Sequence, residues 1–409
     1  MKKVVWSIGL AMTLCFLAVC VLFSCSSSEV GTKELRYTYL EESDSYEVSG
    51  IRDDEIKKVV IPSKYDGKPV TSIGNGAFED CDLLVEITIP DSVTKIGESA
   101  FSGCLDLAKI KLPDSLTRIG SAFKNTAWYK DSRNWEDGIL YNGKYLIAAK
   151  HELESCSIKE GTVLIADGAF MSVHLTSVVI PEGVERIGVL AFGYCELMTE
   201  ITLPESVTHI GDSAFSSSSD TERKVNIDSL EAWMQIEFET CESNPLCNGG
   251  DLYVNGELVS ELVIPESVTE IKKNAFSGWD GLQKVIIHDG VSVIGERAFC
   301  DCTKLSEIQL SNGLTEIKDY TFYRCGFSSF VIPEGVTVIG KGAFSYSPNL
   351  TQITVPKSVT RIEEDAFGTC VHLKTIIYEG TVAEWNANTI GESLFYYTRV
   401  ICTDGEVEL

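Results

Sequence analysis

The sequence predicts an α/β repeat architecture, a single solenoid built from coils of 22 or 23 residues. The first observation is a motif, clearest from Ile89 to Cys104, that recurs along the 409-residue chain. The second is its spacing, because the copies lie 22 or 23 residues apart except for two steps of 47 and 61. Self-similarity at a short fixed period is typical of solenoids. An Ala-Phe or Thr-Phe pair ends each copy, with phenylalanines at Phe78, Phe101, Phe123, Phe170, Phe192, Phe215, Phe276, Phe299, Phe322, Phe344 and Phe367.

Each coil is expected to combine a short parallel strand with a short helical turn. Leu84, Ile87 and Ile89 share one face of an extended segment, which Pro90 ends because proline has no donor for a strand ladder. The Ala-Phe pair at Phe101 fits a short helical turn. A repeat of this length with leucine or isoleucine at fixed offsets is in the leucine-rich-repeat range. One coil is too small to fold alone, so stacking must supply the core, and the array can form one long domain.

Residues 1–24 are expected to be a lipoprotein signal peptide. Two lysines near the start precede a long apolar stretch, which is the composition of an export signal. The end of this stretch resembles a lipobox, so Cys25 is the expected lipidation site and residues 25–35 form a polar tether. The alternative is a retained membrane span. Both interpretations export the chain, and we expect a lipid anchor in the cell envelope, at the outer membrane or cell surface.

The remaining chain is expected to be capped at both ends. Alternating tyrosines predict an N-terminal cap at 36–65, and a solenoid would then run over 66–409. Irregular units near 124–165 and 216–260 replace regular coils, and a C-terminal cap lies near 378–409. We interpret the irregular units as decorations on the solenoid. The expected helices are 126–130, 229–238 and 381–388, the expected hairpins turn at 142–143 and within 252–259, and the last strand is 399–402.

The charge of the chain excludes some classes of partner. The formal net charge is −26, and removal of the leader with its two lysines leaves 32 basic and 60 acidic residues, a net charge of −28. Such a chain is repelled by phosphate backbones and by anionic lipid. We therefore expect no nucleic acid as partner, and membrane contact only through the N-terminal lipid anchor.

The repeating unit resembles the BspA-like (Treponema-type) leucine-rich repeats. The matching residues are Leu84, Ile87, Ile89-Pro90, Ser92-Val93-Thr94, Ile96-Gly97, Ala100-Phe101 and Cys104. The resemblance covers roughly residues 36–409, although His288 and Ser311 replace the proline in two coils. It implies an exported or surface-displayed protein of a host-associated microbe, in a family where some members act as adhesins for host proteins. It does not imply a particular ligand.

The cysteines are expected to be mostly buried free thiols. Beyond Cys25 there are eleven, and six lie three residues after a repeat phenylalanine, in a slot that elsewhere holds threonine, serine, valine or tryptophan. A slot that accepts thiol, hydroxyl and apolar groups indicates packing. Cys241 with Cys247 is the pair that we favour for a disulfide, and Cys300 is expected to be exposed. The six slot residues are Cys81, Cys104, Cys195, Cys302, Cys325 and Cys370.

No catalytic or metal site is expected. Ser92 and Lys95 have the spacing of a Ser-x-x-Lys pair, but the fourth position varies from coil to coil, so the match reflects the repeat. The five histidines are scattered without metal-binding spacing. We therefore expect a protein that is not an enzyme and that has no cofactor.

A binding face is predicted from the alternation along the strands. Where Ile87 and Ile89 point inward, Glu86 and Thr88 point outward, which gives two outward columns. Six of the eleven residues in the second column are aliphatic, as in an interaction strip. The alternative is that β-branched residues simply favour strands. The column contains Val60, Thr88, Lys111, Val179, Thr202, Val263, Ile286, Gln309, Val331, Thr354 and Ile377.

The sequence thus favours a non-catalytic surface binding protein, an adhesin or host-protein-binding lipoprotein that uses the solenoid sheet. The expected partner is a macromolecule, a host matrix or surface protein. One alternative is a scaffold or assembly protein in the periplasm. A second is a glycan-binding surface protein, for which Trp128, Trp135 and Tyr141 would form an exposed platform.

Overall fold

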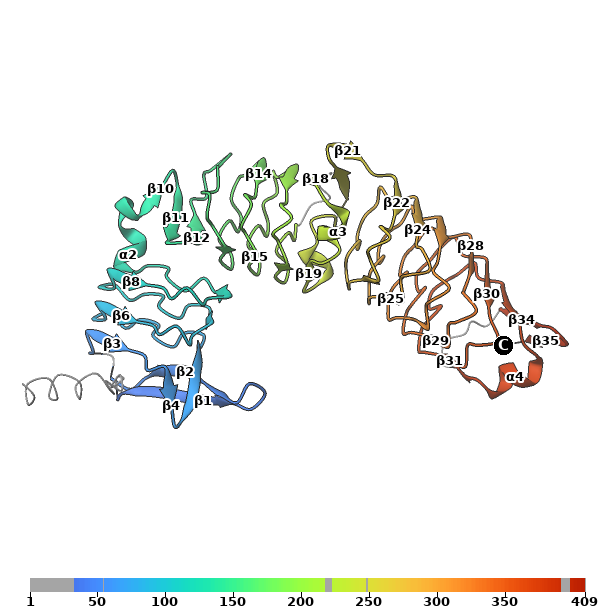
Figure 1. Cartoon of the computed structure of the whole chain (residues 1–409), viewed down its shortest axis with the longest axis horizontal. Helices are drawn as coiled ribbons and strands as arrows, with labels where there is room; N and C mark the ends of the chain where they lie inside the picture. Colours follow the sequence, from blue (N-terminus) through green and yellow to red (C-terminus); the bar gives the residue numbers. More distant parts are fainter. Residues whose placement is uncertain (1–32, 54, 218–222, 248, 391–397, 409) are drawn as a thin grey trace, which may run out of the picture. The chain divides into compact units, whose positions relative to one another are not determined.

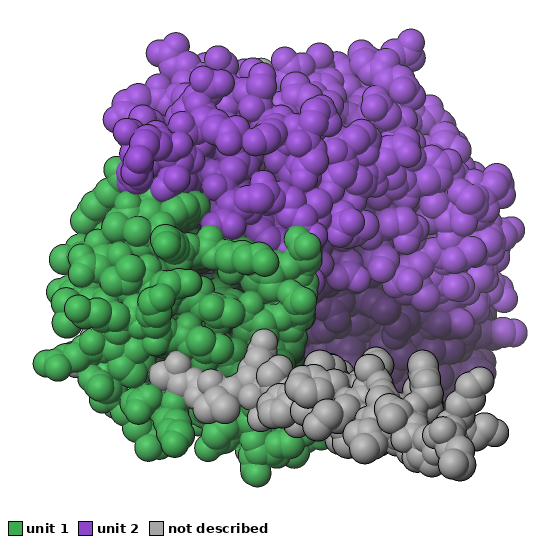
Figure 2. Space-filling view, turned by 60° about the vertical axis from the view of Figure 1, so that its left-hand side comes forward, with its two compact units in different colours: residues 1–116, 123–130 green, residues 117–122, 131–409 purple. Residues whose placement is uncertain are grey.

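The computed structural model describes residues 33–408 except 54, 218–222, 248 and 391–397. The expected signal peptide and the lipidation site at Cys25 lie outside the described residues. The chain divides into two compact units, unit 1 with residues 1–116 and 123–130 and unit 2 with residues 117–122 and 131–409 (Figure 2). No described helix is long and apolar enough to cross a bilayer.

A regular coil contributes one strand to each of two parallel ladders. In the coil that ends at Phe101, β6 (Glu86–Thr88) belongs to the long-strand ladder and β7 (Lys95–Ile96) to the short-strand ladder. The register advances by one coil per strand, so that Ile87 faces Ile110. Within unit 2 the two ladders lie on opposite sides of the coils, as β14, β18 and β24 and then β15, β19 and β25 show in Figure 1.

Unit 1 begins with an antiparallel pair and continues as parallel coils. Strand β1 pairs antiparallel with β2, which pairs in parallel with β5, and β5 pairs with β7. The N-terminal strands therefore join the short-strand ladder and cover its first edge. The elements of unit 1 beside β6 and β7 are β1 (Leu35–Leu40), β2 (Ser45–Ile51), β3 (Lys58–Val60), β4 (Lys64–Tyr65), β5 (Lys68–Ile73), β8 (Lys109–Lys111) and α2 (Ala127–Lys130).

In unit 2 each ladder is divided into three sheets. The first long-strand sheet contains β14 (Ser177–Val179), β16 (Glu200–Thr202), β18 (Arg223–Ile227), β20 (Gly250–Val254) and β21 (Glu257–Leu258). The second contains β22 (Glu261–Val263), β24 (Lys284–Ile286) and β26 (Glu307–Gln309). The third contains β28 (Ser329–Val331), β30 (Gln352–Val355), β32 (Thr375–Tyr378), β34 (Arg399–Cys402) and β35 (Gly405–Glu408). The first short-strand sheet contains β10 (Trp135–Glu136), β11 (Ile139–Asn142), β12 (Tyr145–Ala149), β13 (Leu164–Ile165), β15 (Arg186–Ile187), β17 (His209–Ile210) and β19 (Glu237–Phe238). The second contains β23 (Glu270–Ile271) and β25 (Val293–Ile294). The third contains β27 (Glu316–Ile317), β29 (Val338–Ile339), β31 (Arg361–Ile362) and β33 (Thr389–Ile390). Strand β9 (Arg118–Ile119) also belongs to unit 2.

The solenoid has less helix than the sequence led us to expect. The Ala-Phe segments form hydrogen-bonded turns rather than helices, and the 229–238 helix is limited to α3 (Leu230–Trp233), after which β19 resumes the ladder. The hairpins lie at the expected residues but are not decorations, because β12 pairs with β13 and β20 pairs with β18 within the ladders. The other short helices of unit 2 are α4 (Val382–Ala387), η1 (Ser132–Asn134) and η2 (Cys241–Ser243).

The repeat phenylalanines form the core of both units. In unit 1 the ring centroids of Phe78 and Phe101 are 5.2 Å apart with an interplanar angle of 4°. In unit 2, Phe299 lies 5.5 Å from Phe276 and 5.8 Å from Phe322, and all three are fully buried. Offset stacking at these distances adds to the hydrophobic gain from burial. Each coil therefore derives its stability from its two neighbours.

A hydrogen bond between coils explains why cysteine recurs in the slot three residues after the repeat phenylalanine. The thiols of Cys104, Cys325 and Cys370 each donate to the carbonyl of the preceding coil's repeat phenylalanine, at 3.0, 3.2 and 3.0 Å. Ser347 Oγ makes the same contact with Phe322 O at 3.5 Å. Burial raises the pKa of the Cys104 thiol to about 12, which keeps it neutral and able to donate. As predicted, the slot thiols are buried, and those of Cys104, Cys195, Cys302, Cys325 and Cys370 are in no disulfide.

The solenoid stays packed where the phenylalanine column is interrupted between Phe215 and Phe276. Trp233 fills the core there and donates from Nε1 to Ala275 O at 2.9 Å. Asn244 donates from Nδ2 to Asn274 O at 2.8 Å. Arg223 is buried and donates to three backbone carbonyls, those of Met198, Phe215 and Pro245. Polar side chains thus replace the missing coil-to-coil hydrogen bonds.

Truncation of a central phenylalanine should expose the dependence of each coil on its neighbours. Phe299→Ala is expected to lower the free energy of unfolding by roughly 3–5 kcal/mol, because it opens a void between two stacked rings. Chemical denaturation followed by circular dichroism measures this. The matched control is Leu197→Ala at an exposed leucine, which should change the value by only about 0.5 kcal/mol. Equal losses in the two variants would contradict the stacking argument.

The thiol slot gives a second stability prediction. Cys325→Ala removes the thiol donor to Phe299 O and should cost about 1–2 kcal/mol, because this buried carbonyl keeps only the longer bond from Cys302 N, at 3.4 Å. Cys325→Ser keeps a donor, as Ser347 does in its coil, and should cost less. The same denaturation experiment compares the two. If serine costs as much as alanine, side-chain volume and not the hydrogen bond selects the residue in this slot.

Candidate binding surfaces

The predicted second column lies on the long-strand ladder, as a set of rows within each unit. In unit 1, Val60, Thr88 and Lys111 are register partners on β3, β6 and β8. The three residues are therefore neighbours along the ladder. In unit 2 the rows are Val179 and Thr202; Val263, Ile286 and Gln309; and Val331, Thr354 and Ile377.

The column is outward-facing, and its valines are well exposed. Val179, Val263 and Val331 are 62%, 52% and 68% exposed, which is unusual for aliphatic side chains on strands. Thr88, Lys111 and Gln309 are also exposed, whereas the remaining members are half-buried. Those half-buried members are Val60, Thr202, Ile286, Thr354 and Ile377.

Sequence analysis missed three members of the column in unit 2. The register places Asn226 on β18 and Tyr253 on β20 in the row of Thr202, and Ile401 on β34 beside Ile377. Asn226 and Tyr253 lie on strands that no proline follows, so the Ile-Pro signature did not reveal them. The alternation of apolar and polar residues along Val225, Asn226 and Ile227 is the sequence signal that could have done so.

In unit 1 and in the sheets of β14 and β22 in unit 2, the first outward column carries opposite charges, whereas beside Val331, Thr354 and Ile377 it carries Ser329, Gln352 and Thr375. Lys58 contacts Glu86 at 2.9 Å, Lys224 contacts Glu200 at 3.2 Å, and Lys284 contacts Glu261 at 2.9 Å. The hydrogen bond from Lys58 lowers the pKa of the Glu86 carboxyl. Exposed pairs of this kind add little stability, but they leave a surface with balanced charge. Lys224 Nζ also lies 4.9 Å from the Tyr253 ring centroid, which joins the two columns.

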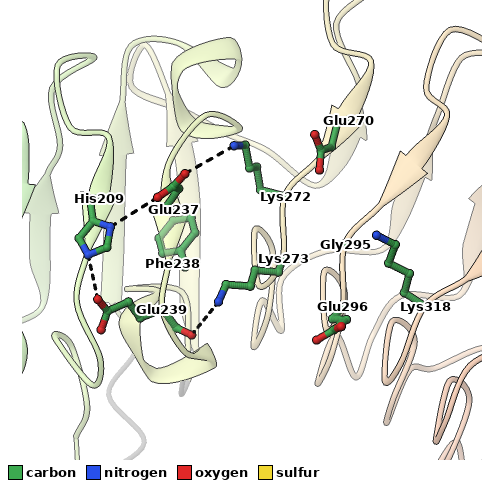
Figure 3. Close-up of a pocket in the computed structure, with 10 residues that line it drawn as sticks. All are labelled: His209, Glu237, Phe238, Glu239, Glu270, Lys272, Lys273, Gly295, Glu296 and Lys318. Carbon is green, nitrogen blue, oxygen red and sulfur yellow. Dashed lines mark hydrogen bonds and ion pairs between the residues drawn. The ribbon is translucent and has the colours of Figure 1, made fainter. Parts of the chain in front are cut away.

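A cleft of about 530 Å³ lies on the short-strand ladder of unit 2 (Figure 3). His209 Nε2 lies 3.0 Å from Glu239 Oε1, and Glu239 Oε2 accepts from Asp212 N at 2.9 Å. Across the cleft, Lys272 Nζ lies 3.9 Å from Glu237 Oε1. The lining residues are His209, Glu237, Phe238, Glu239, Glu270, Lys272, Lys273, Gly295, Glu296 and Lys318.

The cleft lies where one short-strand sheet ends at β19 and the next begins at β23. In many coils the residue after the short strand is glycine, where a Cβ would crowd the preceding coil; a Cβ at Gly188 would lie only 2.6 Å from Asp167 N. After β23 this position is Lys272. Sequence analysis missed the cleft, and a lysine in the glycine slot is the signal that could have indicated it.

The aromatic platform expected for glycan binding is not formed. Trp128 is only 8% exposed and lies against Phe123, with ring centroids 5.7 Å apart, so its expected exposure was wrong. Trp135 and Tyr141 are half-buried, and Tyr141 accepts a hydrogen bond from Lys159 N. The aromatic side chains of this irregular unit serve chiefly to fill space left by a missing coil.

The serines, histidines and cysteines considered for catalysis or metal binding lie in ordinary structural positions. Ser115, the counterpart of Ser92 in the next coil, donates to Val93 O at 2.7 Å, so at Ser115 this position serves a contact between coils. Two scattered histidines, His151 and His174, meet with ring centroids 4.3 Å apart. Among the described residues no group of three or more His, Cys, Asp or Glu side chains could hold a metal. Cys300 is buried, contrary to expectation.

Parallel coils of about 23 residues, a buried phenylalanine column and outward strand rows define a leucine-rich-repeat solenoid. The family model for the BspA type leucine rich repeat region matches residues 52–162, 163–245 and 269–401, in six copies. The match covers more than half of the chain, which therefore belongs to the BspA-type leucine-rich-repeat family. The resemblance seen in the sequence is confirmed.

Solved structures of bacterial repeat proteins are similar over most of the chain. A leucine-rich cell surface protein from Faecalibacterium prausnitzii shares 26% identity, with 89% of this chain and 98% of that chain covered and a TM-score of 0.46. A leucine-rich repeat protein from Bacteroides ovatus shares 25%, with 91% and 98% covered and a TM-score of 0.37. The pneumococcal vaccine antigen PcpA shares 19%, with 91% and 93% covered and a TM-score of 0.48. Among the curated proteins, none matches the chain.

Proposed function

We propose that this protein is a non-catalytic cell-surface binding protein that holds another protein on the outward rows of its long-strand ladder. The observation that carries the proposal is the exposure of Val179, Val263 and Val331 on these rows, which in the sheets of β14 and β22 run beside paired charges. Burial of such side chains by a partner is favourable, whereas water contact is not. The charged column supplies a polar rim, which is how protein interfaces are commonly built.

Host matrix or surface proteins are the proposed partners. The family is one of repeat scaffolds, and extended solenoid surfaces suit macromolecules rather than small substrates. Adhesion requires that the chain is lipid-anchored through Cys25 and faces outward from the cell envelope. Both points belong to the proposal, together with the absence of any catalytic activity.

Surface location is tested by brief protease treatment of intact cells, with a periplasmic protein as internal control. The chain should be cut while the control survives. If the chain is protected until the envelope is broken, adhesion is wrong, and a scaffold role in the periplasm takes its place. That alternative rests on the same rows, since a column that can hold a host protein can equally hold an envelope protein.

Charge introduced into the rows should weaken partner binding. The partner is first selected by screening the purified chain against host matrix proteins and glycans. Val331→Asp, and separately Val179→Asp, should then lower affinity by roughly 10-fold or more, because a carboxylate would be desolvated in an apolar contact. Surface plasmon resonance measures the change.

The matched control for these variants is Val371→Asp. Val371 is 69% exposed, as much as Val331, but it follows the slot residue Cys370 and lies outside both ladders. Its substitution should leave affinity unchanged. If Val371→Asp weakens binding as much as Val331→Asp, or if neither variant matters, the rows are not the interface and their valines reflect strand preference alone. Selective binding of a glycan in the screen would favour the glycan-binding alternative.

A further inference from the structure

The turn from Cys241 to Cys247 bridges the interruption in the phenylalanine column. Cys241 opens η2, and Glu242 O accepts from Phe215 N at 3.2 Å, as an alanine carbonyl does in regular coils. On the other side, a Cβ at Gly278 would lie only 2.6 Å from Cys247 Cα, so Cys247 is pressed against the next coil. This one turn therefore contacts both the coil before the interruption and the coil after it.

The backbone of this turn folds back and brings the two thiols together. Asn244 N donates to Cys241 O at 3.1 Å, and Cys247 N donates to Asn244 O at 3.0 Å. Between these bonds Asn244 leaves the helical region with φ −81° and ψ 123°, which reverses the chain. The side chains of Cys241 and Cys247 are hydrogen-bonded to each other. By contrast, the slot thiols of Cys302 and Cys325 donate to backbone carbonyls.

We propose that Cys241 and Cys247 are an oxidation site, where a disulfide forms and staples the solenoid at its interruption. The oxidant is a small-molecule or protein disulfide, such as glutathione disulfide. The Cys241 thiolate attacks one oxidant sulfur and releases a glutathione thiolate. Cys247 then loses its proton and attacks Cys241 Sγ, which releases the second glutathione. The two protons and two electrons of the cysteine pair end on two glutathione thiols.

The surroundings assign the roles of the two sulfurs. The hydrogen bond from Cys247 lowers the pKa of the Cys241 thiol, and Arg297 acts in the same direction, against burial and the charges of Glu242 and Asp301. The same hydrogen bond, with burial, raises the pKa of Cys247. We assign Cys241, which neighbours the exposed Glu242, as the attacking thiolate, and Cys247, which packs against Gly278 of the next coil, as the resolving thiol. Cys300, which is buried and contacts Asp301, is not the partner in this scheme.

The bond is detected by peptide mapping of the unreduced, purified chain after equilibration with glutathione disulfide. Cleavage after Glu242 separates the two cysteines, so the fragments 240–242 and 243–257 remain linked only if the disulfide is present. We expect one linked species that reduction splits. Because the oxidant is supplied in the buffer, this test depends neither on the cellular location nor on partner binding.

Stability provides a second readout with its own control. Reduction should lower the Tm of the oxidised wild-type chain by a few degrees, because closure of a short loop restricts the unfolded chain. It should also make the irregular unit between Phe215 and Phe276 the first site of limited proteolysis. In Cys241→Ser/Cys247→Ser, reduction should change neither. Two free, alkylated thiols in the oxidised wild-type map, or a Cys241–Cys300 link, would overturn the proposal whether or not the variant folds.

Discussion

The contact of each coil with the next is the constraint on which the rest of the structure depends. A coil of about 23 residues has no interior of its own, and the ring of Phe299 is dry only because Phe276 and Phe322 cover its two faces. Backbone groups follow the same rule, since Phe78 N donates to Ala100 O of the next coil at 2.8 Å. Even the slot cysteines act across this boundary. Every inward position is therefore fixed by its equivalent one coil away.

This constraint explains why the inward pattern could be predicted from the sequence. Because every coil must meet the same packing requirement, the same residue type recurs at the same position of each repeat. The phenylalanine column, the strands before proline and the buried thiols could therefore be predicted from the sequence. Features that depend on one particular junction could not. Trp128 is buried because it fills the space of a missing coil, and no repeated pattern in the sequence indicates this, so it was expected to be exposed. The thiol of Cys325 could be recognised as a hydrogen-bond donor only when the structure placed Phe299 O beside it.

The irregular unit between Phe215 and Phe276 shows what replaces the repeat when its spacing fails. Trp233, Asn244 and Arg223 supply core volume and donors that regular coils obtain from phenylalanine and backbone amides. Burial lowers the pKa of the Arg223 guanidinium, because removing a charge from water costs free energy. Its hydrogen bonds to three backbone carbonyls offset part of that cost. A junction held by single side chains has fewer equivalent contacts than a regular one. It is therefore the place where local opening would begin, and also where the ladder geometry leaves room for a cleft.

Outward positions are released from the constraint that fixes the core. Replacing Val331 changes no contact between phenylalanines, so the outward rows can vary from coil to coil without loss of the fold. In the sheets of β14 and β22, exposed valines lie in one column and opposite charges in the next, and Lys224 contacts Tyr253 across the two columns. Strand preference accounts for the β-branched residues and the tyrosine in the rows, but it does not account for the pairing of opposite charges beside them. Those features suit a surface that binds along its length, with affinity spread over many coils.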